Sequence, residues 1–129
     1  MMTDRTTEPG KAERPDLRLR RSQRLTRSED FRAIYDQRRS LAGRCMVLWV
    51  GKVPGTAMRL GVVASRVIGD AVRRNRAKRR LREAWRLNRH RWSADVDVVL
   101  VARRTIIVAD WEDVVADLLK LARKAGLEA

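Results

Sequence analysis

Residues 59–91 read RLGVVASRVIGDAVRRNRAKRRLREAWRLNRHR, a stretch that decides both the fold and the charge of this chain. Between residues 66 and 91, eleven Lys or Arg side chains stand against two acids, Asp70 and Glu83. From Gly69 onward the apolar residues recur with the period of an α-helix and predict one buried stripe. That stripe comprises Ala77, Leu81, Ala84 and Trp85. The opposite side of the helix should face water and carries Asn75, Arg79, Arg82 and Arg86, flanked by Arg76 and Lys78.

The positive charge of this helix predicts a polyanionic partner. Glu83 is the one acid among nine cations between Arg73 and Arg89, so ion pairs along the helix can hold only a few of them. Arginine at this density suits bidentate contact with phosphate better than lysine does. Nucleic acid is therefore the predicted partner, and a solvated helix face held by its own ion pairs is the plainer alternative.

Composition limits the class of protein. The chain has 129 residues, a net charge of +14 and 44% hydrophobic residues, which suits one domain with a modest core. No apolar run approaches the roughly 18 residues of a membrane span, and the N-terminus lacks a signal peptide, so we expect a cytoplasmic protein without membrane contact. A single cysteine, Cys45, and a single histidine, His90, exclude an internal disulfide and a Cys/His zinc site.

The N-terminal part of the chain divides into a tail and a helix. Residues 1–22 carry six positive and four negative side chains without periodicity, which predicts a disordered basic tail, and residues 23–129 form the single folded domain. A helix is predicted from about residue 27 to residue 38, because Thr26 and Glu29 have the spacing of a capping box. Its apolar side consists of Phe31, Ile34 and Tyr35.

Three strands are predicted in the rest of the chain. The run CMVLWV at residues 45–50 predicts the first and residues 59–65 the second. The compact link at 51–57, with its Pro-Gly pair, predicts that these two strands form an antiparallel hairpin. Residues 95–102, DVDVVLVA, are apolar on both faces in their second half and predict a central third strand. The basic helix joins the second strand to the third, so we expect a parallel β-α-β unit, right-handed by default.

A last helix completes the fold. Asp110 is predicted to cap it, and Gly126 to end it. The order α-β-β-α-β-α predicts an α+β fold, a two-layer sandwich in which helices cover a sheet. The buried stripe of the last helix comprises Val114, Leu118, Leu121, Ala122 and Ala125.

Residue types that catalysis requires are scarce. His90 lies among arginines at the end of the basic helix, where a phosphate contact is a better interpretation than general-base catalysis. Asp95 and Asp97 point to one face of a strand, as a metal-binding pair would, but ion pairs with nearby arginines are the plainer interpretation. No catalytic residue and no metal ligand is therefore predicted. Trp85 and the thiol of Cys45 are assigned to the interior, and Trp111 to packing at the start of the last helix.

Phe31, Tyr35 and Trp49 allow two interpretations. Aromatic residues at such spacing most often join the core. A cleft between a helix and a sheet, lined by aromatic rings and bordered by arginines, also suits single-stranded nucleic acid. In such a cleft the bases stack on the rings while the phosphates pair with guanidinium groups.

Several segments of the chain resemble the bacterial ribonuclease P protein subunit. Residues 72–85, VRRNRAKRRLREAW, are similar to the Arg-Asn-Arg signature helix of that family, and residues 60–69, LGVVASRVIG, to the strand and loop before it. The similarity begins near Arg24-Leu25 and EDF at residues 29–31, and continues through DVVLVAR at residues 97–103 to the final helix. The resemblance is specific because these segments occur together in one order.

The resemblance implies a fold and a function. The fold is a small α+β domain like the second domain of ribosomal protein S5, with a left-handed β-α-β crossover that replaces the right-handed default. In that family a large RNA is the catalyst, and it cleaves precursor tRNA with bound magnesium ions to form the mature 5′ end. The protein subunit binds this RNA and the 5′ leader of precursor tRNA. The implied activity is therefore that of a ribonucleoprotein endonuclease, a hydrolase whose catalytic centre lies on the RNA.

Partners and site residues follow from the same resemblance. We expect an RNA-binding domain that itself binds no cofactor and needs no obligate protein partner. Residues expected to contact the catalytic RNA are Arg73, Arg74, Asn75, Arg76, Lys78, Arg79, Arg82 and Arg86. Residues expected to form the leader cleft are Phe31, Tyr35 and Trp49, with Ser65 and Arg66 beside them.

The chain departs from the family pattern at two internal positions. Val67 stands where the family often has a lysine, which removes one phosphate contact. Arg38 or Arg39 stands where a glycine usually follows the first helix. The N-terminal tail is also longer than the family leads us to expect.

Three other classes of protein fit parts of the pattern. A structural RNA-binding protein, such as a ribosome-associated module, would use the same charge without contacting a tRNA precursor. A nuclease that cuts with its own residues would need metal ligands that the sequence does not supply. A DNA-binding protein would make similar phosphate contacts, although the irregular spacing of the arginines shows no pattern for reading bases.

Overall fold

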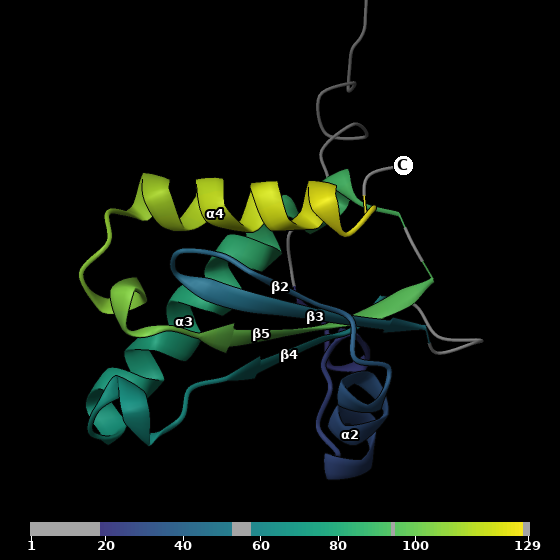
Figure 1. The fold of residues 1–129 in the computed structure, drawn as a ribbon, viewed down its shortest axis with the longest axis horizontal. Coiled ribbons are helices and arrows are strands. Elements are labelled where there is room, and N and C mark those ends of the chain that lie inside the picture. The colour runs from purple at the N-terminus through teal and green to yellow at the C-terminus, as the bar shows by residue number, and fades with distance from the viewer. Residues whose placement is uncertain (1–18, 53–57, 94, 128–129) are drawn as a thin grey trace, which may run out of the picture.

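A four-stranded mixed sheet forms the centre of the computed structural model, which describes residues 19–52, 58–93 and 95–127 (Figure 1). Within this part of the chain the strands lie in the order β2-β3-β5-β4. Strand β5 pairs antiparallel with β3 and parallel with β4, so it is central, as its two apolar faces predict. The strand bounds are Ser40–Ala42 for β2, Met46–Lys52 for β3, Leu60–Val63 for β4 and Val96–Ala102 for β5.

The predicted hairpin between residues 45–50 and residues 59–65 is wrong. Strand β5 lies between β3 and β4, so Leu100 faces Leu48 on one side and Val62 on the other. A strand that is apolar on both faces belongs inside a sheet, where partners satisfy the backbone groups along both of its edges. The edge strand β2, which was not predicted, pairs antiparallel with β3.

In the described part of the chain, three α-helices pack on the sheet: α2 (Ser28–Asp36), α3 (Ala71–Asn88) and α4 (Trp111–Lys124). Helices α3 and α4 lie on one face of the sheet and α2 on the other (Figure 1). The predicted two-layer sandwich is therefore corrected to a sheet that carries helices on both faces. Helix α3 joins the parallel strands β4 and β5 in a β-α-β unit, and its left-handed crossover stays a prediction.

Successive side chains of each strand point to opposite faces of the sheet, so they belong to two separate cores. Met46, Leu48 and Val50 are buried with α3 and α4, whereas Trp49 packs with α2 on the opposite face. The stripe predicted for α3 is confirmed, since each of its four members is fully buried. The stripe predicted for α4 is buried apart from Ala125, which is half-buried.

The tryptophans divide between interior and surface. Trp85 is buried, as predicted, and its ring lies 4.7 Å from the ring of Trp92, centroid to centroid. Trp111, predicted to pack at the start of the last helix, is 36% exposed. Trp111 is the first residue of α4 and follows the N-cap Asp110, whose side chain makes no capping hydrogen bond. Trp111 therefore lies at the edge of the main core, which Val114 of the same turn enters.

The N-terminal cap predicted for α3 is found, whereas the cap predicted for α2 is not. Asp70 caps α3 as predicted, and its Oδ1 accepts a hydrogen bond from the backbone N–H of Arg73 at 3.0 Å. The capping box of Thr26 does not form, because Arg27 takes the N-cap position of α2 and no side chain caps it. After α2, Arg38 has a φ of 55°, a left-handed conformation that favours glycine.

The folded domain begins before residue 23. Residues 1–18 of the predicted tail and residues 53–57 of the predicted turn lie outside the described residues. Leu19 packs against the main core, and the backbone N–H of Leu25 donates to the carbonyl of Leu60 at 2.8 Å. Short 3-10 helices connect the main elements: η1 (Arg21–Gln23), η2 (Arg66–Ile68), η3 (Arg89–Arg91) and η4 (Arg104–Ile107).

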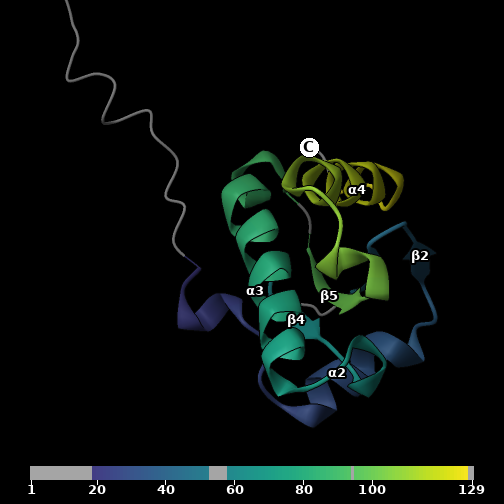
Figure 2. The ribbon, with the colours of Figure 1, turned by 90° about the vertical axis from the view of Figure 1, so that its left-hand side faces the viewer.

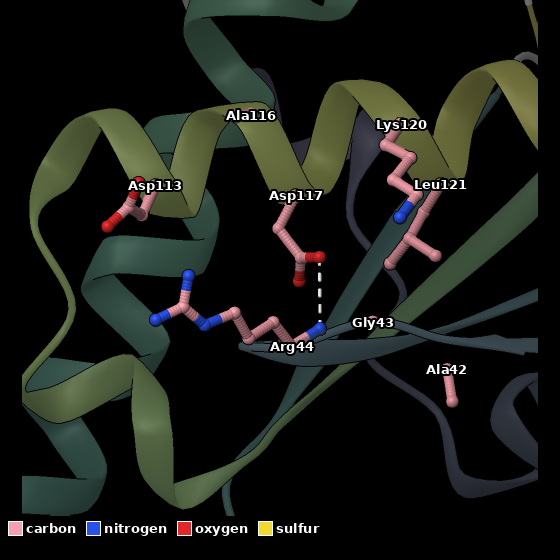
Figure 3. Close-up of a pocket in the computed structure, with 8 residues that line it drawn as sticks. All are labelled: Ala42, Gly43, Arg44, Asp113, Ala116, Asp117, Lys120 and Leu121. Carbon is pink, nitrogen blue, oxygen red and sulfur yellow. Dashed lines mark hydrogen bonds between the residues drawn. The ribbon is translucent and has the colours of Figure 1, made fainter.

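Two buried carboxylates hold together segments that are distant in the sequence. Asp117 of α4 accepts from the backbone N–H groups of Arg44 at 3.0 Å and Cys45 at 2.8 Å, which ties the β2–β3 turn to the helix (Figure 3). Asp97 of β5 accepts from the backbone N–H of Arg59 at 3.0 Å and from its guanidinium group at 2.6 Å. Burying a carboxylate costs free energy unless such donors bind it. Both contacts therefore favour the fold in which these donors reach the two carboxylates.

Replacing Asp117 by alanine should destabilise the protein, because the backbone N–H groups of residues 44 and 45 would lose their acceptor. We expect Asp117→Ala to lower the free energy of unfolding by about 2 kcal/mol, measured by urea denaturation. Lys120→Ala is the matched control, since Lys120 is exposed on the same helix (Figure 3) and should change that free energy by less than about 0.5 kcal/mol. Equal losses in the two variants would contradict the role given to Asp117.

Candidate nucleic-acid interface

The exposed side of α3 presents basic residues to solvent. Within the described part of the chain, Arg76, Lys78, Arg79 and Arg82 make no hydrogen bond and no ion pair. The buried stripe on the other side of α3 prevents the helix from turning these groups inward. Their charge is therefore available to a partner. We call the following set the α3 basic face: Asn75, Arg76, Lys78, Arg79, Arg82 and Arg86.

Three of the residues predicted to contact RNA also have contacts within the protein. Arg73 lies 3.8 Å from Asp70 in an exposed ion pair, and Arg74 donates from Nη1 to the carbonyl of Gly69 at 2.8 Å. The guanidinium group of Arg86 donates to both carboxylate oxygens of Glu83 at 2.9 Å. These hydrogen bonds from Arg86 lower the pKa of Glu83, so the carboxylate stays ionised. The two ends of α3 thus contribute less free charge than its middle.

A hollow of about 400 Å³ lies along the α3 basic face. Its wall includes Leu19 and Arg24 from the segment before α2, so the face extends beyond the helix. Arg24 was not predicted as a site residue, because only the bridge that joins it to Leu60 of β4 brings it beside α3. No local pattern in the sequence reports such a pairing. The remaining lining residues are Asn75, Lys78, Arg79, Arg82, Glu83 and Arg86.

Two further arginines of this region anchor the fold instead of facing solvent. Arg80 donates to the carbonyls of Ile106 and Ala109, the second at 2.8 Å, and so ties α3 to the segment before α4. Arg89 donates to the carbonyl of Met58 at 3.0 Å, and its burial lowers the pKa of its guanidinium group. Only part of the positive charge counted in the sequence is therefore free to bind a ligand.

The aromatic residues predicted to line a cleft come together on the other face of the sheet. Phe31 and Tyr35 line a shallow hollow of about 420 Å³ with Ser28, Arg32 and Val63. The ring of Trp49 does not line this hollow, but it packs edge-on against Tyr35 with 5.0 Å between ring centroids. The three aromatics are half-buried around a small core. Their role in binding single-stranded nucleic acid stays a prediction. Burial also raises the pKa of the Tyr35 phenol, which stays protonated.

A glycine of β4 allows this arrangement. A Cβ atom at Gly61 would lie 2.6 Å from Cζ of Phe31 and 3.3 Å from Cβ of Leu25, so any larger residue would push the ring away. Phe31 therefore lies directly on the backbone of β4. The floor of the aromatic hollow is set by the absence of a side chain at this position.

Ser65 and Arg66, predicted to lie beside the cleft, are exposed at the start of η2. They follow β4, whose last residue Val63 lines the aromatic hollow. Neither of them is among the residues that line it. Their contact with a bound leader stays a prediction.

The remaining candidates for chemistry take structural or exposed positions. Asp97 is fully buried and paired with Arg59, which confirms the interpretation of Asp97 as an ion-pair partner. Asp95 and His90 are exposed, and Cys45 is a buried free thiol whose pKa is raised, first by burial and then by Asp117. No group of three His, Cys, Asp or Glu side chains in the described residues could hold a metal ion. No described helix is long and apolar enough to cross a membrane.

Sequence comparison relates this chain to a known family. The family model for ribonuclease P matches residues 19–126. The ribonuclease P protein component of Alkaliphilus oremlandii is 33% identical over 104 residues, which cover 81% of this chain and 91% of that protein. The corresponding protein of Chloroflexus aurantiacus is 38% identical over 110 residues, which cover 84% of this chain and 82% of the relative.

Solved structures show the same α+β fold. The RNase P protein of Staphylococcus aureus matches with a TM-score of 0.73 at 26% identity, covering 83% of this chain and 98% of its own. The RNase P protein of Thermotoga maritima matches with a TM-score of 0.65 at 33% identity, covering 85% of this chain and 97% of its own. The similarity thus extends over nearly the whole described domain.

Removing the one acid on the α3 basic face should strengthen RNA binding. Glu83→Gln deletes the carboxylate that pairs with Arg86, so we expect the dissociation constant for a structured RNA to fall about twofold to threefold. A filter-binding titration at low salt measures it. Glu29→Gln is the matched control, because Glu29 also pairs with an arginine, Arg27 at 3.4 Å, but on α2. The same gain in both variants would show that net charge alone sets the affinity.

Proposed function

This chain belongs to the ribonuclease P protein family, the protein component of a ribonucleoprotein that processes tRNA, and we propose that it binds RNA through two separate surfaces. The α3 basic face binds the catalytic RNA. The aromatic hollow between α2 and the sheet holds the 5′ leader of precursor tRNA. Binding both at once positions the scissile bond against the catalytic RNA.

One observation carries this proposal: within the described residues, the cations in the middle of α3 have no partner, while the other side of the helix is fully buried. Arg76, Lys78, Arg79 and Arg82 neutralise RNA phosphates and displace condensed counterions. Guanidinium groups suit this role because they can donate two hydrogen bonds to one phosphate. The burial of Ala77 and Leu81 fixes the backbone positions from which these side chains extend before RNA binds.

The aromatic hollow supports the second half of the proposal. Phe31 and Tyr35 offer partly exposed rings on which unpaired bases can stack, and Arg32 lies beside them for the phosphates. Stacking is tolerant of base identity, which suits a leader of varied sequence. Trp49 supports Tyr35 from the side, so the ring of Tyr35 is already oriented.

We place the catalytic centre on the RNA, so the holoenzyme is an endonuclease and hydrolase to which this chain contributes binding and orientation. Magnesium ions held by the RNA supply the metal chemistry of the cleavage. The best candidate for a carboxylate ligand on the chain, Asp97, is already occupied by Arg59. The partners are thus the ribonuclease P RNA and precursor tRNA, without an obligate protein partner or a membrane. The location is cytoplasmic.

Reconstitution tests the proposal directly. The chain is mixed with a bacterial ribonuclease P RNA, and cleavage of precursor tRNA is followed at low magnesium concentration with and without the protein. We expect the protein to raise the cleavage rate, and we expect the protein alone to cut nothing at any magnesium concentration. Cleavage by the protein alone would identify it as a nuclease in its own right. No effect on the RNA-catalysed rate would overturn the proposal.

Tyr35→Ala should separate leader binding from general RNA binding. Loss of one stacking ring should weaken binding of leader-bearing precursor tRNA to the reconstituted holoenzyme about tenfold and leave mature tRNA unaffected. Equilibrium binding of the two RNAs measures this, with Tyr35→Phe as a control that keeps the ring. If both RNAs weaken alike, the chain is a structural RNA-binding protein without a leader site.

The position of the charge should matter more than its amount. Arg79→Ala with Arg82→Ala removes two cations from the α3 basic face, whereas Arg5→Ala with Lys11→Ala removes two from the N-terminal tail. We expect the first pair to weaken binding to ribonuclease P RNA at least tenfold more than the second, because its cations are held in place on a helix. Gel-shift titrations at one salt concentration compare the two. Equal losses would show that net charge suffices.

A further inference from the structure

A second hollow lies beside the α3 basic face, between α3 and the start of α4. It has a volume of about 340 Å³. Arg79 and Glu83 line both this hollow and the one along the α3 basic face, so the two hollows adjoin at these side chains. The lining residues are Arg79, Arg80, Glu83, Leu87 and Trp111.

Trp111 is the unusual member of this group. It is 36% exposed, although its neighbours on the same side of α4, Val114 and Leu118, are fully buried. Single exposed apolar residues are common on protein surfaces. Trp111 differs from a scattered apolar residue because it shares its hollow with two arginines.

The surroundings of Trp111 hold it in place. Arg80 of α3 donates to the carbonyls of Ile106 and Ala109, and so fixes the segment that leads into α4. Helices α3 and α4 are in contact, and Figure 2 shows them side by side. The indole therefore stands at a set position beside α3 and loses little conformational entropy when a ligand binds.

The charge of the hollow favours an anionic ligand. Arg79 has no partner within the described residues, and Arg80 uses only part of its guanidinium group to anchor the loop. The one acid, Glu83, already accepts two hydrogen bonds from Arg86. An exposed indole beside a free guanidinium group matches the two parts of a nucleotide, a base with a π-face and a phosphate.

We propose that Trp111 is a stacking platform for an unpaired base of the catalytic RNA, whose adjoining phosphate pairs with Arg79. This inference rests on the proposed function and deepens it, because it extends the RNA-binding surface from α3 to α4. In this arrangement an RNA strand bound along the α3 basic face has a phosphate at Arg79. The next nucleotide of that strand lies at the indole of Trp111. An apolar side chain of a protein partner is the competing occupant, and the charge of the hollow disfavours it.

Substitutions at Trp111 test the proposal through affinity for a ribonuclease P RNA transcript. Trp111→Ala should weaken binding about 5-fold to 150-fold, the range expected for one base stacked on an aromatic ring. Trp111→Phe keeps a π-face and should retain most of the affinity, whereas Trp111→Leu keeps only apolar volume and should bind as weakly as Trp111→Ala. Val108→Ala is the control, since Val108 is 83% exposed and lies outside the hollow.

Fluorescence gives a second readout that does not depend on affinity. Trp49, Trp85 and Trp92 are present in both the wild-type chain and Trp111→Phe, so the difference in emission between the two reports on the exposed indole. Stacking of a base should quench this difference signal when RNA is added. Unchanged emission at saturating RNA would overturn the proposal even if Trp111→Ala proved too unstable to measure.

The outcomes separate this inference from the function on which it rests. If Trp111→Leu binds as well as the wild type, the stacking platform is wrong. If Trp111→Ala binds RNA normally while Arg79→Ala binds it weakly, the platform is again wrong but the α3 basic face stands. If both variants bind normally, the platform is wrong, and the proposed function is decided separately by the reconstitution.

Discussion

Burial of one side of α3 against the sheet is the contact on which the other features depend. Ala77, Leu81 and Trp85 are fully buried in the main core and set the rotation of the helix about its axis. The opposite side must then face solvent, and it carries Arg76, Arg79 and Arg82. Burial of apolar area, worth about 25 cal/mol per Å², thus keeps a row of like charges together despite their repulsion. The surface is arranged before any ligand arrives.

The arginines of this basic chain divide into two groups by their contacts. Arg59, Arg80 and Arg89 bind carboxylate or carbonyl oxygens of the chain itself and hold distant segments together. Arg79 and Arg82 have no such acceptor within the described residues. A net charge of +14 therefore overstates the positive charge that a ligand meets. The distribution of that charge over the surface says more about binding than the total does. A row of such cations runs along α3, on the far side of the sheet from the aromatic hollow, which is why we assign two RNA segments to one small domain.

Local patterns predicted the helices well and the pairing of the strands poorly. The stripe of α3 and its cap at Asp70 follow from residues within a few positions of one another, and both are found. The hairpin was wrong because strand pairing depends on residues far apart in the sequence, and β5 inserts between strands that are neighbours along the chain. The same limit explains why the role of the buried Asp117 was missed, because it depends on a turn more than seventy residues away.

The central claim is that free cations on α3 bind RNA by neutralising its phosphates. The dependence of RNA affinity on salt tests this claim most directly, measured as the equilibrium constant for ribonuclease P RNA over a range of monovalent salt concentrations. If roughly six phosphates are neutralised, a plot of the logarithm of the binding constant against the logarithm of salt concentration should have a slope of about −4 to −5. A slope near zero would contradict the account, because the cations would then take no part in binding.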